Sequence, residues 1–256
     1  MELDNIAKIL FQAEHLVVLA GAGLSKESGL PTFRGEEGYW KVGSKNYHPM
    51  ELATYRTFCQ IPKDVWSWYH YRRDVYGKAK PNPGHYAITD LQNFKKKQGK
   101  KFHLVTQNVD GLNLRANADS EITYQIHGNL NFMRCKDECT EEIFEIPENS
   151  NNIPICPKCG KNARPHVLWF DETYNEVHFK FYSALALKNE MDVLLTVGTT
   201  LQTNIPYQLF ATAVQRSIPI IFIDPFPPAE LEDLPIHIIA KESGKILPEI
   251  VMKIKE

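Results

Sequence analysis

Short runs of apolar residues alternate along this chain with longer segments whose apolar positions recur at helical spacing. The first such segment, residues 4–13, predicts a helix with one apolar face behind an Asp4 N-cap. Five apolar runs predict buried strands: 15–21, 102–108, 191–199, 218–224 and 236–240. Three later segments predict helices: 176–187, 205–217 and 246–255. This alternation predicts an α/β fold built on a doubly wound, Rossmann-like parallel sheet with helices on both faces.

Two segments interrupt the alternation and predict a smaller lobe. One contains two more helical patterns within residues 62–98, and the other contains two pairs of cysteines separated by a polar stretch. We therefore expect a single domain, residues 1–256, with two lobes. The larger, Rossmann-like lobe takes about 1–35, 100–130 and 165–256. The smaller lobe takes about 36–99, which is helical, and 131–164, which is a cysteine module.

Composition narrows the class of protein. Hydrophobic residues make up 43% and charged residues 23% of the chain, which is typical of a globular protein and excludes a disordered, collagenous or coiled-coil chain. A formal net charge of −2 argues against a nucleic-acid-binding surface. No apolar run approaches the ~20 residues that span a bilayer, and the N-terminal segment has no secretion-signal pattern. We expect a cytoplasmic protein without membrane contact.

Four of the five cysteines lie close together in the pattern C-x3-C-x16-C-x2-C. Disulfide frameworks are typical of small secreted chains, whereas this spacing is typical of zinc sites with four thiolate ligands. The polar segment between the two pairs cannot form much of a core, and a bound metal would supply the missing folding energy. The alternative is a set of unrelated buried cysteines. We predict one structural Zn²⁺ ion held by Cys135, Cys139, Cys156 and Cys159.

The predicted first strand ends in Gly21-Ala22-Gly23-Leu24-Ser25, and a helix is expected to follow. In a doubly wound sheet, backbone amides at this place bind pyrophosphate groups. Lys26 stands where G-x-G-x-x-G requires its third glycine, so the motif does not indicate an ordinary dehydrogenase. A simple glycine-containing turn is the alternative.

Further motifs follow in a definite order: GAGLSKESGLPTFRG at 21–35, TQNVDGL at 106–112, HGN at 127–129, the four cysteines and GTT at 198–200. On these motifs, from about residue 15 to residue 248, the chain resembles the sirtuins, a family of NAD-dependent protein lysine deacylases. The resemblance implies a catalytic domain that consumes NAD as co-substrate and holds a structural zinc. It also implies acylated lysine side chains of proteins or peptides as substrates.

The resemblance identifies His127 as the catalytic base. Deacylation at the expense of NAD breaks the nicotinamide–ribose bond, and a base must then take a proton from a ribose hydroxyl. Histidine suits this task because its ordinary pKa lies near ~6.5. Taken without the other motifs, a histidine before Gly-Asn is more typical of a turn or of packing.

The resemblance also implies a set of cofactor-binding residues. Within it, Asn108 and Asp110 hold the nicotinamide carboxamide and position a water, and Gln107 contacts the ribose; the alternative is a polar turn. Phe33, next to Arg34, shields the reaction. Asp224 replaces the family's usual asparagine, and its carboxylate favours NAD over NADP because it would repel a 2′-phosphate. The set is Gly21, Ala22, Gly23, Ser25, Phe33, Arg34, Gln107, Asn108, Val109, Asp110, Gly198, Thr199, Thr200, Asp224 and Ser243.

The acyl pocket carries the most informative departure from ordinary deacetylases. Ala53 stands where those enzymes carry a bulky side chain, and Tyr69 and Arg72 lie three residues apart, on one face of a predicted helix over 62–79. A guanidinium and a hydroxyl at a pocket base would bind a carboxylate, as in the class III branch that removes succinyl and malonyl groups. The alternative is a Tyr69 packed in the core and an Arg72 on the surface.

Peptide binding is implied for residues 164–172, which pair with the substrate peptide in sirtuins. Val167 and Phe170 are the expected contacts, whereas Asp171 stands where glycine is usual in the family. Two other functions compete with deacylation. One is ADP-ribosyl transfer or NAD hydrolysis by the same bond cleavage, and the other is a non-catalytic NAD-binding module.

Overall fold

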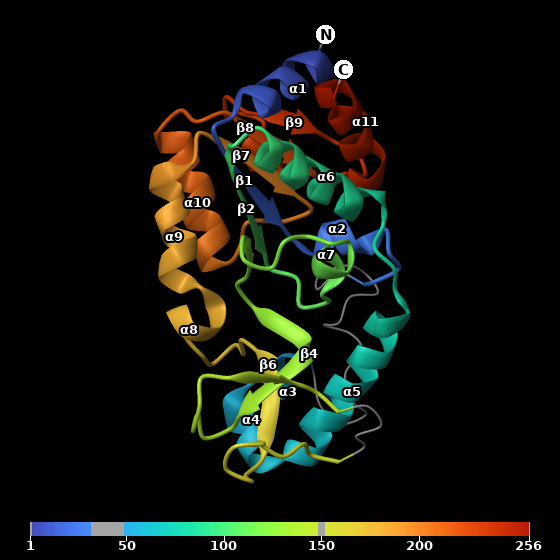
Figure 1. Ribbon diagram of the computed structural model, residues 1–256, viewed down its shortest axis with the longest axis vertical. Helices are drawn as coiled ribbons and strands as arrows, with labels where there is room; N and C mark the ends of the chain where they lie inside the picture. The colour runs from blue at the N-terminus through green and yellow to red at the C-terminus, as the bar shows by residue number, and fades with distance from the viewer. Residues whose placement is uncertain (1, 32–48, 148–151, 256) are drawn as a thin grey trace.

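The computed structural model describes residues 2–31, 49–147 and 152–255 and consists of two lobes (Figure 1). The larger lobe contains a six-stranded sheet in the order β3-β2-β1-β7-β8-β9, in which every pairing is parallel. This confirms the predicted doubly wound sheet. The strands are β1 (His15–Ala20), β2 (Lys101–Thr106), β3 (Thr123–Gln125), β7 (Val193–Val197), β8 (Ile220–Ile223) and β9 (His237–Ile239).

Helices cover both faces of this sheet, which is why its central strands are apolar at almost every position. In β1, Leu16, Val18 and Ala20 face one core cluster, and Val17 and Leu19 face another. The first face packs against α1 (Glu2–Gln12), α6 (Pro83–Lys97) and α11 (Ser243–Lys255). The second packs against α9 (Phe181–Glu190) and α10 (Asn204–Gln215), on the left of Figure 1.

Helix α6 corrects the expected division between the lobes. We expected residues 36–99 in the smaller lobe, but α6 packs against α11 and β2, and its Ala87, Ile88 and Leu91 belong to the core of the larger lobe. Lys95 on the same helix is fully buried, and its Nζ donates to the backbone oxygens of Ala13 (2.7 Å) and Phe11 (3.0 Å). The Lys95 side chain therefore also satisfies backbone carbonyl groups at the C-terminal end of α1.

The smaller lobe combines a three-stranded antiparallel sheet with helices. Its strands run in the order β5-β4-β6 and are β4 (Gly128–Cys135), β5 (Ile143–Glu145) and β6 (Ala163–Val167). Its helices are α3 (Pro49–Leu52), α4 (Tyr55–Gln60) and α5 (Pro62–Lys78). The short elements elsewhere are α2 (Ala22–Lys26), α7 (Leu112–Arg115), α8 (Glu176–Phe179) and a 3-10 turn, Ala229–Leu231. In the part of the chain that the structure describes, no helix has both the length and the apolar character to cross a membrane.

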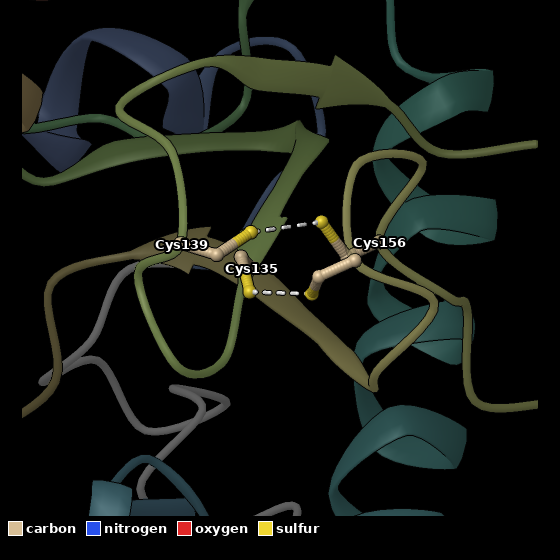
Figure 2. A group of neighbouring side chains, drawn as sticks. Cys135, Cys139 and Cys156 are labelled. Carbon is tan, nitrogen blue, oxygen red and sulfur yellow. Dashed lines mark hydrogen bonds between the residues drawn. The ribbon is translucent and has the colours of Figure 1, made fainter.

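The four clustered cysteines converge in the smaller lobe. Figure 2 shows Cys135, Cys139 and Cys156, whose sulfur atoms lie close together. Their Sγ atoms lie within 4.8 Å of one another, with 3.6 Å between Cys135 and Cys159 and 3.7 Å between Cys139 and Cys156. A tetrahedron with Zn–S bonds of about 2.3 Å places its sulfurs about 3.8 Å apart, whereas a disulfide needs about 2.05 Å. The four thiols therefore fit a closed zinc site that joins the end of β4 to the turn before β6.

Three glycines allow the loop after β1 to touch the loop after β7. The Gly23 N–H donates to the Gly198 oxygen over 2.8 Å, and the Gly21 N–H donates to the Val197 oxygen over 2.9 Å. A Cβ on Gly23 would lie 2.7 Å from the Gly198 Cα, and Gly198 itself has a φ of +61°. Side chains at these positions would force the two loops apart.

Gly23→Ala should therefore destabilise the fold, because backbone atoms rather than a flexible side chain oppose the new methyl group. We expect a loss of about 1–3 kcal/mol and a fall in Tm of about 2–4 °C per kcal/mol, measured by thermal unfolding. Gly77→Ala is the matched control. Its Cβ would meet nothing within 4 Å, and removing a glycine from a helix should stabilise the protein by up to about 1 kcal/mol. A Gly23→Ala protein as stable as the wild type would contradict the steric argument.

The sulfur geometry predicts one zinc ion per chain in protein purified without chelators, measured by elemental analysis. Cys135→Ser should lose that zinc and unfold at lower temperature, because the metal contributes folding energy to a lobe with a small sheet. Cys59→Ser is the control, since Cys59 lies apart from the cluster in α4 and is exposed. Equal zinc content in both variants would exclude the four-cysteine site.

Candidate active site

The motif residues meet at the carboxyl ends of β1, β2 and β7. The loop Gly21–Ser25 follows β1, residues 107–110 follow β2, and Gly198–Thr200 follow β7. Strands β2 and β7 lie on either side of β1, so the chain leaves this part of the sheet in opposite directions. Ligands of open α/β sheets bind in the crevice that such a divergence creates. The helix expected after the glycines is short, since α2 ends at Lys26.

Ser25, Asn108 and Asp110 form a buried polar network at the floor of this crevice. The Asn108 Nδ2 donates to the Gly21 oxygen (2.9 Å) and to the Ser25 Oγ (3.2 Å), and the Ser25 hydroxyl donates to the Asp110 Oδ2 (2.7 Å). Burial raises the pKa of Asp110, while hydrogen bonds from the Leu112 N–H and Ser25 oppose that rise. The network holds these three side chains in one arrangement.

Gln107 connects the same crevice to the loop after β7. Its Nε2 donates to the Thr199 Oγ1 over 2.8 Å, and its Oε1 accepts from the Thr203 hydroxyl over 3.0 Å. Both the nitrogen and the oxygen of the Gln107 side-chain amide are therefore hydrogen-bonded to the segment that carries Thr199 and Thr203. Thr200, the next residue, is exposed at the surface of the crevice.

His127 lies between β3 and β4 at the junction of the two lobes. Its Nδ1 lies 3.0 Å from the Gln107 backbone oxygen and its Nε2 lies 2.8 Å from the Tyr174 hydroxyl. A carbonyl oxygen can only accept, so Nδ1 carries the hydrogen and Nε2 is the basic atom of the neutral ring. Burial lowers the pKa of His127 to about 4, against a smaller opposing effect of the Gln107 contact. The ring is therefore neutral at physiological pH.

Three of the five predicted substrate-binding residues, Ala53, Tyr69 and Val167, lie in one apolar cluster. Ala53, Tyr69, Val109 and Val167 all belong to it, together with Trp169, whose Nε1 donates to the Tyr69 hydroxyl oxygen over 2.7 Å. Val109 thus faces this cluster, although the resemblance grouped it with the cofactor. Burial raises the pKa of Tyr69, and the nearby Arg72 charge opposes that rise.

Arg72 is buried among aromatic rings, so the alternative of a surface arginine is wrong. Its side chain is 2% exposed, and its guanidinium carbon lies 4.7 Å from the Trp68 ring centroid. Its Nη2 donates to the Tyr76 hydroxyl over 3.2 Å. Tyr69 and Arg72 do share one face of α5, as their spacing predicted, with the guanidinium carbon 5.5 Å from the Tyr69 ring centroid.

The remaining predicted residues lie at the margin of the crevice. Asp224 follows β8, its Oδ1 accepts from the Phe226 N–H (2.8 Å), and burial raises its pKa. Ser243 begins α11 and is buried, and its hydroxyl donates to the Glu27 Oε1 (2.8 Å), so this hydroxyl connects α11 to the end of α2. Phe33 and Arg34 lie outside the described residues.

Two residues of the segment expected to contact the peptide, Phe170 and Asp171, differ in their surroundings. Phe170 is 55% exposed, and its N–H donates to the Ala53 oxygen over 3.0 Å. Asp171 is also exposed, but its carboxylate accepts from the N–H groups of Tyr55 (2.7 Å) and Arg56 (3.0 Å) at the start of α4. The residue that departs from the family pattern is therefore a helix cap.

Sequence reasoning missed two side chains of this site. Trp169 stands out in the sequence only as part of a strand segment, although it donates to Tyr69. Tyr174 was not singled out at all, because a single aromatic residue in a loop has no periodicity or spacing that marks it. The sequence contains no signal that would have placed its hydroxyl against His127.

Comparisons with known proteins agree with this geometry. The profile of the Sir2 family matches residues 21–204. An NAD-dependent protein deacylase of Thermus thermophilus is 39% identical over 225 residues, which cover 88% of this chain and 85% of that protein. One of Leptospira interrogans serovar Lai is 36% identical over 253 residues, covering 98% of this chain and 97% of the relative.

Solved structures of the family have the same fold. A mutant Sir2 homologue in complex with ADP-ribose superimposes with a TM-score of 0.83 at 31% identity, covering 98% of this chain and 96% of that one. A Sir2 homologue in complex with NAD gives 0.82 at 32% identity, covering 98% and 93%. These matches confirm the resemblance to sirtuins. Since the family profile spans most of the sequence and the matches cover 85% and 97% of the two relatives, the chain belongs to the Sir2 family.

Proposed function

We propose that this protein is an NAD-dependent protein lysine deacylase in which His127 is the general base. The observation that carries the proposal is the state of that ring: Nδ1 is held by the Gln107 oxygen, and Nε2 remains as the basic atom of a neutral imidazole. A base must be unprotonated at the working pH and held in one orientation, and His127 meets both requirements. The names of the relatives, NAD-dependent protein deacylases, support the same reaction.

The crevice has the donors and acceptors that NAD requires. When bound, NAD supplies a ribose carbon that can receive the acyl oxygen once nicotinamide leaves. Asn108 and Asp110 would bind and orient the nicotinamide end from a buried network, and Gln107 with Thr199 would face the ribose and phosphates. Asp224 would accept from adenosine ribose hydroxyls, and its negative charge favours NAD over NADP.

An acylated lysine on a peptide fits the edge of the smaller sheet. β6 is the last strand in the order β5-β4-β6, so one of its edges has no partner among the described strands. An extended peptide can add to such an edge through backbone hydrogen bonds. The edge ends at Val167, beside the apolar cluster that contains Ala53, so the lysine side chain would enter between the lobes.

Within this reaction we assign a preference for acidic acyl groups, such as succinyl and malonyl, to Tyr69 and Arg72. A buried guanidinium among aromatic rings has lost most of its water, and a carboxylate is the ligand that best replaces it. Ala53, with its small side chain, leaves room for a longer acyl group. An acetyl group brings no negative charge to this site.

ADP-ribosyl transfer or NAD hydrolysis is the competing reaction. The buried Arg72 argues against it, because a reaction with water requires no residue that binds a carboxylate. Mass spectrometry separates the two after incubation of an acyl-lysine peptide with NAD. Deacylation produces free lysine peptide with O-acyl-ADP-ribose, whereas hydrolysis produces ADP-ribose and leaves the peptide acylated.

His127→Ala should abolish deacylation while NAD still binds, because the ring acts on a substrate that is already seated. Removal of a general base costs about 10²–10⁴-fold in rate. The measurements are deacylation at saturating NAD and NAD affinity by calorimetry. His237→Ala, on the far edge strand β9, is the control and should keep both properties. Activity above about a tenth of wild type would exclude His127 as the base.

Arg72→Met should lower kcat/KM for succinyl-lysine peptide by about 5- to 150-fold, the effect of the about 1–3 kcal/mol that removing one partner of a buried polar contact costs. Deacetylation should stay unchanged or rise, because an acetyl group has no charge to lose. Arg73→Met makes the same charge change on the next residue of α5, about 100° around the helix, and should alter neither reaction. Equal loss of both activities in Arg72→Met would assign Arg72 a purely structural role.

A further inference from the structure

Tyr174 lies directly against the proposed base, although neither the sequence motifs nor the fold marked it. Its hydroxyl is 2.8 Å from the His127 Nε2, and the two ring centroids are 5.9 Å apart. The residue stands in the segment that leads from β6 to α8 and is half-buried. It therefore belongs to the junction between the lobes, where the base and the acyl-binding cluster meet.

The hydrogen bond that the His127 Nδ1 makes determines the direction of the hydrogen bond between Nε2 and the Tyr174 hydroxyl. Because the His127 Nδ1 donates to the Gln107 oxygen, Nε2 must accept, and the Tyr174 hydroxyl must donate. Burial raises the pKa of Tyr174 to about 12, against a smaller opposing effect of a hydrogen bond with Thr203. The phenol therefore keeps its proton at physiological pH and can donate it.

A neutral imidazole has one basic lone pair, and in His127 this lone pair, on Nε2, already accepts the hydrogen bond from the Tyr174 hydroxyl. A ribose hydroxyl can thus reach the base in two ways. It can displace the phenol, or it can donate to the phenol oxygen, which also has acceptor lone pairs, and pass its proton on. The anchoring of Tyr174 decides between these alternatives.

Tyr174 is held in place on both sides. Its ring stacks on Phe181, with centroids 5.7 Å apart and planes inclined by 18°. The next residue, Asn175, caps α8 by accepting from the His178 N–H over 2.8 Å. Two residues before it, the Glu172 carboxylate accepts from the Trp169 N–H over 3.0 Å. Displacing the phenol would break its stacking on Phe181 as well as its hydrogen bond to His127, whereas proton transfer through it would leave the ring where it is.

We propose that Tyr174 is a proton relay between a ribose hydroxyl of bound NAD and His127. The inference rests on the proposed role of His127 and adds a second residue to the proton path. The ribose hydroxyl gives its proton to the Tyr174 oxygen, and Tyr174 gives its own proton to Nε2. Tyr174 ends protonated, His127 becomes an imidazolium, and the electron pair left on the ribose oxygen makes it the nucleophile.

Tyr174→Phe tests the relay, because it removes one oxygen and keeps the ring that stacks on Phe181. Deacylation should fall by about 10²-fold or more, within the range for loss of acid–base catalysis. Exchange of labelled nicotinamide into NAD in the presence of acyl peptide should persist, since it needs bond cleavage but no ribose deprotonation. In the free enzyme, the pKa of His127 followed by NMR should rise, because a donor to the neutral ring is lost.

Tyr182→Phe is the matched control, since Tyr182 is 70% exposed on α9 and should change none of these quantities. Deacylation by Tyr174→Phe equal to or faster than wild type would overturn the relay and show that the phenol is displaced. Equal loss of exchange and deacylation, or an unchanged His127 titration, would also overturn it. His127→Ala separates the two hypotheses: if that variant retains deacylation, the proposed base is wrong whatever Tyr174 does.

Discussion

The hydrogen bonds of a single residue, Gln107, connect the parts of the active site. Its backbone N–H donates to the Ala20 oxygen at the end of β1, and its side chain binds Thr199 and Thr203 in the loop after β7. Its backbone oxygen accepts from the His127 ring and thereby sets the tautomer of that ring. The end of β2 therefore determines both the shape of the crevice and the chemistry of the group beside it. The position of the loops and the tautomer of His127 are therefore both set by contacts of this one residue.

A second constraint comes from two adjacent carboxylates that point to different partners. Asp171 caps α4 in front of the Ala53 loop, whereas Glu172 pairs with the buried Arg134 and Arg164 beneath the sheet. The short segment between β6 and α8 is thus fixed to the helical and to the sheet half of the smaller lobe at once. The aspartate that replaces the family's glycine adds a contact rather than removing one.

The sequence was informative wherever one physical signal decides the structure. Uninterrupted apolar runs predicted five of the six strands of the parallel sheet, because strands buried on both faces are apolar throughout. Cysteine spacing predicted the sulfur tetrahedron, and the motif order predicted the family. The sequence did not reveal which lobe α6 joins, since an amphipathic helix shows that it has a buried face but not what covers it. Nor did it reveal the contacts of Tyr174 and Asp171, which depend on how distant loops approach each other.

The order of the strands has a consequence for how the protein is made. β1 lies in the centre of the sheet, yet its neighbours come from far along the chain: Val17 is paired with His103 on one side and with Leu194 on the other. Contacts between residues so distant in sequence form slowly, because the chain between them must lose conformational entropy before the contact can stabilise the fold. During synthesis the first glycine loop emerges long before Gly198, the residue against which it must pack. The crevice is consequently assembled late, and a ribosome-bound chain that stops short of β7 has a β1 with an unpaired edge and no second wall for its cofactor site.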